Sequence, residues 1–217
     1  MLALITVRVW FTKVDEAAYI SLLDLQRVMG RALKRSKLPV WYSQGFNPHV
    51  YMTFSAPLAL GQESLVESMD FKTEAETLDW DTAKTALAAA LPRGICVQRV
   101  EPANMSADKI AFAQYVITWN EKNIELQKKA ISAYNEQDIA NVEKKTKKGV
   151  KTVDLKQYVE KLNIEDDKLN LLLPTGNLLN INPELLLEFL HTLGGAQAES
   201  ARILRTKLLT ENKELFL

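Results

Sequence analysis

Residues 43–49 read Ser-Gln-Gly-Phe-Asn-Pro-His and separate two short apolar runs, residues 38–42 and 50–56. Gly45 accepts a positive φ, Pro48 has a fixed φ, and Asn47 before it is pushed toward an extended conformation. The pattern predicts a shaped loop between two strands. Its side chains are Ser43, Gln44, Phe46, Asn47 and His49. They fit a binding loop, and they fit equally a turn whose polar groups bond only to neighbouring backbone.

The residues before this loop predict a strand followed by a basic helix. Residues 4–12 alternate, with Val7 and Val9 on one face and Arg8 and Trp10 on the other, as in a half-buried strand. Residues 20–36 have helical period instead. The apolar face is formed by Leu22, Leu25, Met29, Ala32 and Leu33, and the opposite face by Arg27, Arg31, Lys34 and Arg35. Leu23 interrupts the polar face, and Gly30, which costs about 1 kcal/mol relative to alanine, predicts close packing there.

The rest of the chain repeats a similar order of elements. We expect strands at 39–43, 50–56, 66–73 and 95–100, with a helix over 83–91 capped by Asp81. The second set is strands at 114–119, 140–146, 169–173 and 203–209, a helix at 122–134, and another opened by Asn182-Pro183, with 150–164 ambiguous. This order predicts an α+β fold of two tandem ferredoxin-like halves, each an antiparallel sheet with helices on one face. The predicted halves are residues 1–101 and 114–217, joined by a connector at 102–113.

Charge is balanced overall and uneven along the chain. The 217 residues contain 27 Lys and Arg and 27 Asp and Glu, so net charge indicates no partner. Residues 1–58 hold seven Lys and Arg against three acids, and residues 143–161 hold seven Lys against three acids. Residues 59–81 hold one Lys against seven acids. These two basic zones and one acidic zone are either interaction surfaces or ordinary solvated surface.

Several classes of chemistry are not expected. One cysteine, Cys96, and two histidines, His49 and His191, do not suffice for a zinc site or an iron–sulfur cluster. Neither G-x-x-x-x-G-K-[ST] nor G-x-G-x-x-G occurs. We expect Cys96, which lies within a predicted strand, to be a buried inert thiol. No acid stands at a recognisable spacing to orient a Ser43–His49 pair. We therefore expect no cofactor and no catalysis by this chain alone, with an enzyme using the 43–49 loop as the weaker alternative.

The expected location is the cytoplasm. The apolar start of the chain is too short for the hydrophobic region of a signal peptide, and it lacks the basic flank. No stretch approaches the roughly 18 apolar residues of a membrane span.

Several blocks of the sequence resemble the radical-SAM-linked bacterial proteins, a family of unknown function. The blocks are Ser21 to Leu25, Arg31 to Arg35, Pro39, Ser43 to His49, Leu58 to Gly61, Thr146 to Asp154 and Arg202 to Leu208. Members occur alone or fused to the C-terminus of a radical SAM protein. The family usually reads Ser-His-Leu-Asp-Leu where this chain has Ser21-Leu22-Leu23-Asp24-Leu25, so any role of that histidine is lost here.

The resemblance implies an accessory piece with a radical SAM protein as partner, because the chain lacks the Cys-x-x-x-Cys-x-x-Cys motif of the catalyst. Tandem ferredoxin-like halves with basic zones also resemble RNA-binding architectures, including the CRISPR repeat-processing proteins. That likeness is an analogy of fold.

Two functions follow as hypotheses. The first is RNA binding, with Arg8, Trp10 and Trp41 or Tyr42 on an open sheet face. These aromatic rings either stack on bases or pack in the core or between the halves. Phosphates would be held by Arg27, Arg31, Lys34, Arg35, Lys147, Lys148 and Lys151. The second is docking to the partner through the acidic 63–81 zone or the open sheet. In either case we expect Gln44, Asn47 and His49 to border a concave surface shared with the N-terminal part of the 20–36 helix.

Overall fold

A computed structural model of the protein describes residues 4–75, 78–146, 149–176 and 179–217. The chain forms two compact units. The first unit comprises Met1–Ile110 together with Leu215–Leu217, and the second comprises Ala111–Glu214. Among the described residues, no helix has the length and apolar character needed to cross a membrane.

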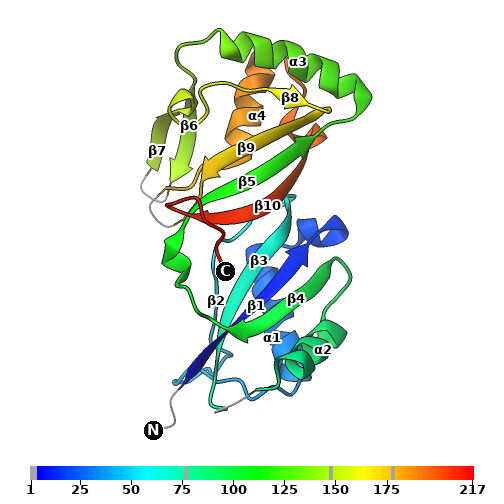
Figure 1. The fold of residues 1–217 in the computed structure, drawn as a ribbon, viewed down its shortest axis with the longest axis vertical. Helices are drawn as coiled ribbons and strands as arrows, with labels where there is room; N and C mark the ends of the chain where they lie inside the picture. The colour runs from blue at the N-terminus through cyan, green and yellow to red at the C-terminus, as the bar shows by residue number, and fades with distance from the viewer. Residues whose placement is uncertain (1–3, 76–77, 147–148, 177–178) are drawn as a thin grey trace. The chain divides into compact units, whose positions relative to one another are not determined.

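The first unit is an antiparallel sheet covered by two helices (Figure 1). Its elements are β1 (Ile5–Lys13), η1 (Asp15–Tyr19), α1 (Leu22–Arg35), β2 (Met52–Phe54), β3 (Glu63–Thr73), α2 (Trp80–Ala90), β4 (Ile95–Pro102) and η2 (Ala107–Lys109). The strand order is β4-β1-β3, with β2 pairing on β3, and each of these pairs is antiparallel. This is the ferredoxin-like order, which places the first strand in the middle of the sheet.

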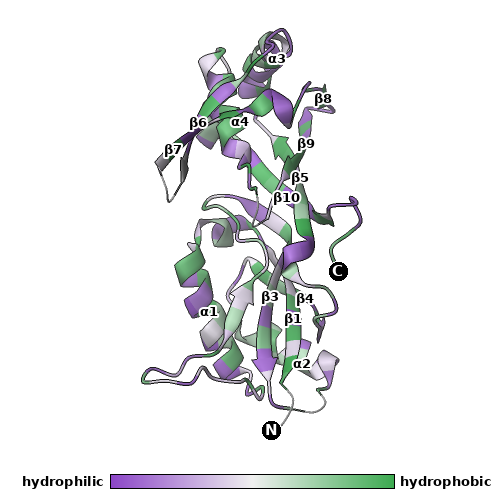
Figure 2. Cartoon of the chain, turned by 90° about the vertical axis from the view of Figure 1, so that its left-hand side faces the viewer, coloured by the Kyte–Doolittle hydropathy of each residue, from purple (hydrophilic) through white to green (hydrophobic). Residues whose placement is uncertain are grey.

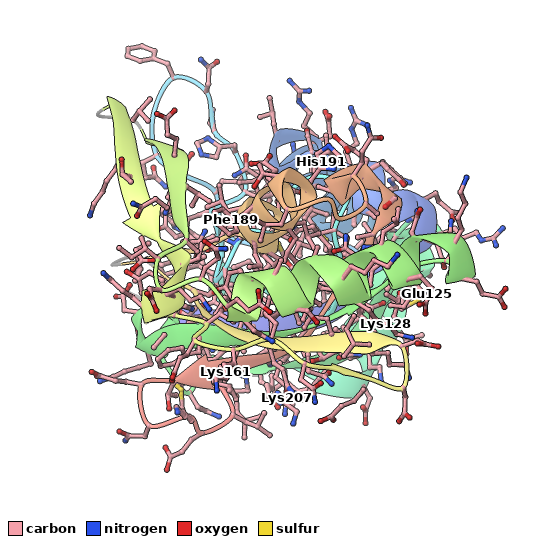
Figure 3. The ribbon with its side chains drawn as sticks, turned by 90° about the horizontal axis from the view of Figure 1, so that it is seen from above. Glu125, Lys128, Lys161, Phe189, His191 and Lys207 are labelled. Carbon is pink, nitrogen blue, oxygen red and sulfur yellow. The ribbon has the colours of Figure 1, made fainter. Side chains whose placement is uncertain are left out.

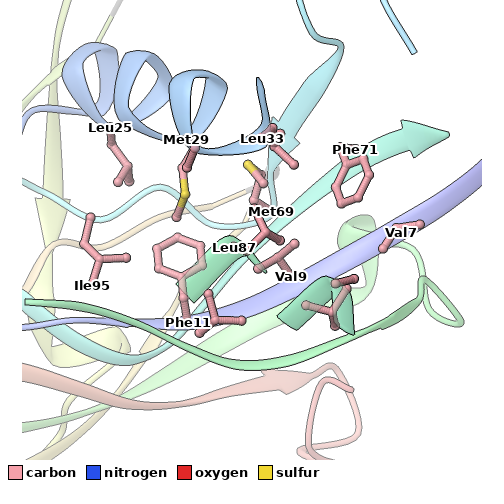
Figure 4. Packing of buried hydrophobic residues seen from close by; sticks show 14 of the residues in the cluster. Val7, Val9, Phe11, Leu25, Met29, Leu33, Met69, Phe71, Leu87 and Ile95 are labelled. Atoms are coloured by element: carbon pink, nitrogen blue, oxygen red, sulfur yellow. The ribbon is translucent and has the colours of Figure 1, made fainter. Parts of the chain in front are cut away.

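The core of the first unit lies between the sheet and both helices. Alternate β1 side chains, Val7, Val9 and Phe11, point to one face because successive strand residues face opposite sides. Figure 4 shows Leu25, Met29 and Leu33 of α1 facing these residues and Met69. Ala83 and Leu87 of α2 join the same cluster. The apolar stripe predicted at 20–36 therefore covers the sheet, apart from Leu22, which is partly exposed.

The second unit repeats this order and adds a hairpin. Its elements are β5 (Ile110–Thr118), α3 (Glu121–Asn135), β6 (Asn141–Thr146), β7 (Gly149–Asp154), η3 (Leu155–Gln157), β8 (Ile164–Glu165), β9 (Lys168–Pro174), α4 (Pro183–Thr192), η4 (Ala198–Ser200) and β10 (Arg202–Thr210). Its strand order is β10-β5-β9-β8. Strands β6 and β7 form a separate antiparallel two-stranded sheet.

Side chains of α3 and α4 close the core of the second unit. Tyr134 of α3 is buried, and its hydroxyl donates a hydrogen bond to the Val159 carbonyl at 2.6 Å. Its ring meets the edge of Phe189 from α4, with the ring centroids 6.0 Å apart. Figure 3 shows Glu125 and Lys128 along α3 and Phe189 and His191 on α4. On the outer side of α3, Lys128 pairs with Glu125 at 3.0 Å and Asp167 at 3.2 Å.

The predicted fold class is confirmed, and the differences are local. The 39–43 and 50–56 strands reduce to single bridges, Val40 to Thr73 and Tyr42 to Val50, plus the short β2. The cap of α2 is Asp79 rather than Asp81, and its carboxylate accepts from the backbone N–H groups of Asp81 and Thr82. Strand β5 begins at residue 110, inside the segment predicted as a connector. Residues 150–154 of the ambiguous 150–164 segment pair with β6 as part of β7, and Leu155–Gln157 continue as η3.

Two expectations about burial were wrong, the half-buried character of β1 and the burial of Cys96, whereas the alternative in which Trp10 packs in the core is borne out. Arg8 is 1% exposed and Trp10 is 5% exposed, so β1 is buried on both faces and offers no open aromatic surface. Phe216 lies on them, with its ring centroid 5.5 Å from that of Trp10 and 4.6 Å from the Arg8 guanidinium carbon. Cys96 is exposed rather than buried, because it alternates with the inward-facing Ile95 and Val97 on β4.

Candidate functional site

Backbone hydrogen bonds close the 43–49 loop at its base. The Ser43 N–H donates to the His49 carbonyl at 2.8 Å, and the Tyr51 N–H donates to the Trp41 carbonyl at 3.2 Å. Together with the Tyr42–Val50 bridge, these bonds hold the two ends of the loop side by side. Gly45 has a φ of +142°, a conformation that side-chain-bearing residues rarely adopt. The predicted shaped loop is therefore present, although its flanking segments are bridges rather than full strands.

Ser43 and His49 form one hydrogen-bonded pair inside this loop. The Ser43 Oγ lies 2.9 Å from His49 Nδ1 and accepts from the His49 backbone N–H at 3.2 Å. His49 Nδ1 also lies 3.2 Å from the Asn47 carbonyl oxygen, which can only accept. This geometry favours a proton on Nδ1, leaving Nε2 as a hydrogen-bond acceptor. The 2.9 Å contact lies within the range of a nucleophile–base pair, but the Asn47 carbonyl beside the same nitrogen argues against Nδ1 acting as the base.

The remaining side chains of the loop are open to solvent. Phe46 has an exposed fraction of 106%, the largest among the exposed apolar side chains. Gln44 and Asn47 are exposed, and their side chains make no hydrogen bond to any described residue. A fully exposed ring between two unengaged amides serves no packing role in the first unit. These three side chains are therefore available to a ligand.

A shallow cavity of about 450 Å³ lies between α1 and the segment that follows the loop. We call it the α1 groove. Its described lining is Leu23, Gln26, Arg27, Gly30, Arg31, Lys34, His49, Val50 and Met52. That lining contains three permanent cations and no carboxylate. Figure 2 shows hydrophilic and hydrophobic residues alternating around α1, whose other face is in the core.

The charges of the α1 groove are only partly compensated. Arg27 pairs with Asp24 at 2.8 Å across one exposed turn of the helix. The Ser21 hydroxyl and then Arg27 donate to this carboxylate, and both bonds lower the pKa of Asp24. Arg31 and Lys34 make no ion pair with any described residue, although Lys34 Nζ lies 5.7 Å from the centre of the Tyr42 ring. One neighbouring carboxylate against three cations leaves the groove with a net positive charge.

Aromatic rings flank the base of the loop. Trp41 and Tyr51 meet edge to face at 5.8 Å, and Lys72 Nζ lies 4.8 Å from the Tyr51 ring centre. Tyr42 and Tyr51 are partly exposed. Of the aromatics predicted for base stacking, the structure thus buries Trp10 and leaves Tyr42 accessible.

The structure brings together only some of the predicted site residues. Arg27, Arg31, Lys34 and His49 share the α1 groove, whereas Gln44, Phe46 and Asn47 are exposed on the loop without lining it. Ser43 supports His49, and Arg35 is exposed outside the lining. Lys151 lies on β7 in the second unit. Lys147 and Lys148 lie outside the described residues.

Sequence reasoning missed Leu23, Gln26 and Met52 in the lining. The signal for the first two was present, because Leu23, Gln26, Gly30 and Lys34 recur at three- and four-residue spacings along one helix face. Gly30 permits the close approach predicted for it, since a Cβ there would lie 3.3 Å from Met52 Cε.

The acidic zone at 63–81 is not a continuous solvated surface. Glu63 and Glu67 are buried, and Glu63 accepts from the Asp15 backbone N–H at 2.9 Å. Asp70 forms a two-bond pair with Arg8 at 2.7 and 2.8 Å. Asp79 is the cap of α2. Most of these carboxylates therefore have structural partners inside the first unit.

Comparison with known proteins places the chain in a family without assigning an activity. The family model described as "Uncharacterized protein conserved in bacteria (DUF2344)" matches residues 6–183. A search of the curated proteins finds no match. One solved structure, "Crystal Structure of an Unknown Protein from Galdieria sulphuraria", is 16% identical over 93% of this chain and 96% of that chain, with a TM-score of 0.29. The radical SAM link stays a prediction.

Proposed function

The chain belongs to this bacterial family of uncharacterized proteins, and from that premise we propose that it is a non-catalytic accessory module that binds single-stranded RNA for a radical SAM partner. The observation that carries the RNA assignment is the α1 groove, with three cations and no carboxylate in its described lining. Phosphates are the ligands expected for such a surface, because each contact releases counterions from the nucleic acid.

The neighbouring loop offers groups that can contact the bases, which phosphate binding alone does not. Phe46 presents a fully exposed ring, and unpaired bases stack on such rings irrespective of sequence. His49 Nε2, Gln44 and Asn47 offer acceptors and donors for base edges. In a duplex each base is stacked between its neighbours and its pairing edge is occupied, so this arrangement favours single strands over duplexes.

The radical SAM partner is inferred from sequence resemblance. The resemblance covers the loop 43–49 and the later blocks, and the chain contains one cysteine, so it does not hold a three-cysteine cluster by itself. In this proposal the accessory module presents RNA to a catalyst that modifies or processes it. Copurification of a radical SAM protein with the tagged chain from its native cell tests the partner separately from the RNA.

Docking without RNA contact is the second candidate, and two observations weaken it. The acidic zone is largely engaged by Arg8, Asp15 and the start of α2. The β1 face that would have served as an open contact is buried. An enzyme using the loop is weaker still, because His49 Nδ1 faces a carbonyl as well as Ser43.

The test is a charge reversal in the α1 groove. The triple variant R27E/R31E/K34E should lose most of its affinity for a labelled 20-nucleotide single-stranded RNA measured by fluorescence anisotropy. Losing three phosphate contacts should also make the slope of log K against log salt shallower by about 2, at about 0.7 per contact. The matched control is K122E/K129E/K161E, which changes the net charge equally at exposed lysines of the second unit.

Two results would contradict the proposal. One is an unchanged affinity of the triple variant at several salt concentrations. The other is an equal loss in the control variant, which would mean that only total charge matters. A duplex of the same sequence should bind more weakly than the single strand, since the Phe46 ring then has no base to stack on.

A further inference from the structure

The hairpin of β6 and β7 places two lysines directly opposite each other. Lys144 and Lys151 are register partners in this antiparallel ladder. Like charges in this position destabilise a strand pair. Neither lysine forms an ion pair with a described residue, and Lys144 Nζ instead donates to the Asn180 carbonyl oxygen. The hairpin thus pairs two lysines in register, and neither of them has an ion-pair partner among the described residues.

The same two lysines line a cavity of about 580 Å³ in the second unit. This volume lies within the usual range for small-molecule sites. The other described lining residues are Asn141, Thr152, Val153, Asp154, Gln157, Tyr158, Gly176, Leu179 and Asn180. The wall therefore combines two cations with amide and hydroxyl groups, one aromatic ring and a leucine.

The one carboxylate in this lining is already engaged. Asp154 Oδ1 accepts from the backbone N–H groups of Ala140 at 2.9 Å and Lys156 at 3.1 Å. These bonds make Asp154 the cap of η3 and fix its carboxylate toward its own backbone. No ion pair joins it to either lysine among the described residues, and two lysines against one carboxylate leave the described lining with a net positive charge.

We propose that this cavity is a phosphate site that takes one nucleotide, with Lys144 and Lys151 on its phosphate. A phosphate in this cavity can accept charge-assisted hydrogen bonds from both lysines, and its negative charge offsets their positive charge. Tyr158 and Leu179 provide a surface for the base, and Asn141 and Gln157 provide polar groups for the sugar and base edges.

The site is independent of the α1 groove, and it stands whether or not the first unit binds RNA. Its nucleotide can come from two sources, a free nucleotide or the phosphorylated end of an RNA strand. Both present the same phosphate monoester to the lysines. The experiment therefore contains an arm for each source.

The first measurement is binding of AMP, adenosine and inorganic phosphate by isothermal titration calorimetry. The wild-type protein should bind AMP and should bind adenosine at least tenfold more weakly. The variants K144Q, K151Q and K144Q/K151Q should each lose AMP affinity, the double variant by at least tenfold. The control K161Q/K168Q removes two exposed lysines outside the cavity and should bind AMP as the wild type does.

The second measurement compares a short RNA carrying a 5′-phosphate with the same RNA carrying a 5′-hydroxyl. Tighter binding of the phosphorylated RNA, lost in K144Q/K151Q and retained in R27E/R31E/K34E, assigns the site to a strand end. Binding of AMP alone assigns it to free nucleotides.

Thermal unfolding shows whether a variant that does not bind AMP is less stable than the wild type or is folded and has lost only the binding site. Without ligand, K151Q should be at least as stable as the wild type, because the mutation removes a like-charge pair. AMP should raise the melting temperature of the wild type and leave that of the double variant unchanged. The proposal is overturned if AMP and the 5′-phosphorylated RNA both fail to distinguish the wild type from K144Q/K151Q.

Discussion

The two edges of the His49 ring have different surroundings. One edge is hydrogen-bonded within the loop, and the ring is also accessible in the α1 groove. Its Nδ1 edge faces Ser43 Oγ and the Asn47 carbonyl, and its ring also lines the α1 groove. Asn47 contributes only its backbone to this arrangement, because its exposed side chain bonds to no described residue. The structural and binding roles of the loop are therefore separable by mutation.

We predict different outcomes for three alanine variants of the loop. N47A should leave the melting temperature unchanged. S43A should lower it slightly, since one exposed hydrogen-bond network is worth about 1 kcal/mol. H49A should keep a near-normal melting temperature and weaken RNA binding by about fivefold to tenfold, the loss of one hydrogen bond to the ligand.

Calorimetry and fluorescence anisotropy on the same preparations check this prediction. A melting temperature of H49A lowered by many degrees, with normal binding by the folded fraction, would show that the loop is only scaffold.

At the scale of elements, the spacing of apolar residues along the sequence predicted most helices and strands. It could do so because an element that is buried on one face has apolar residues at the period of its own geometry. The 20–36 helix is the clearest case, since Leu25, Met29 and Leu33 face the core as their spacing predicts. Alternation predicted wrongly that Arg8 and Trp10 lie on a solvent-exposed face. A period of two identifies the residues that share a face of a strand, but it does not identify what packs on that face. Their cover, Phe216, lies about two hundred residues away in sequence.

The candidate site was predictable to a similar degree. The loop follows from Gly45 and Pro48, and the cations of α1 follow from helical spacing. The shared groove of α1 and His49 depends on tertiary packing, and so does the cavity at Lys144 and Lys151. No local pattern reports that the segment around residue 180 lies beside the β6–β7 hairpin.

The packing of α3 gives a prediction at this scale. Tyr134 is buried beneath the segment that follows η3, and burial, aided by the charge of Asp154, raises its pKa to about 12. An unfolded tyrosine titrates near pH 10, so the folded state binds this proton more tightly. The resulting stability, roughly 2–3 kcal/mol, is complete below about pH 10 and is lost as the pH rises toward 12.

Urea unfolding followed by circular dichroism between pH 8 and 11.5 tests this sign. Y134F should be less stable than the wild type at pH 8, because the Val159 carbonyl loses its donor, by about 1 kcal/mol. The difference in free energy of unfolding between the two proteins should narrow above pH 10. The wild type loses stability there as the tyrosine ionises, whereas Phe cannot ionise. Parallel curves for the two proteins across this range would contradict the assigned pKa shift.

At the scale of the whole molecule, the repeated order β-α-β-β-α-β predicted the fold class, and the hairpin of β6 and β7 is the addition to it. The first unit is discontinuous in sequence, because residues 215–217 belong to it while residues 111–214 form the second unit. Phe216 is 3% exposed within this arrangement. Beneath it lies the buried Arg8–Asp70 pair, with the guanidinium of Arg99 5.0 Å from the centre of the Trp10 ring.

We predict that F216A destabilises the first unit by about 3–5 kcal/mol, the usual cost of removing a buried phenylalanine side chain. The adjacent L217A is the matched control, because Leu217 is 55% exposed and its truncation should be nearly neutral. Denaturant unfolding followed by tryptophan fluorescence measures both. Equal stability of the two variants would mean that Phe216 does not hold this face of β1.

Because residues 215–217 belong to the first unit, that unit cannot be completed until the second unit has been translated. A ribosome adding 5–20 residues per second needs on the order of 5–20 s to make the roughly one hundred residues between Ile110 and Phe216. During that interval β1 and β3 have left the ribosome while the ring that covers Arg8 and Trp10 has not yet been made. The unit that is translated first is thus completed only when residues 215–217 have been made. A nascent chain stalled within the second unit lacks Phe216, so its Trp10 stays uncovered. Exposed apolar side chains of this kind are the surfaces that chaperones bind.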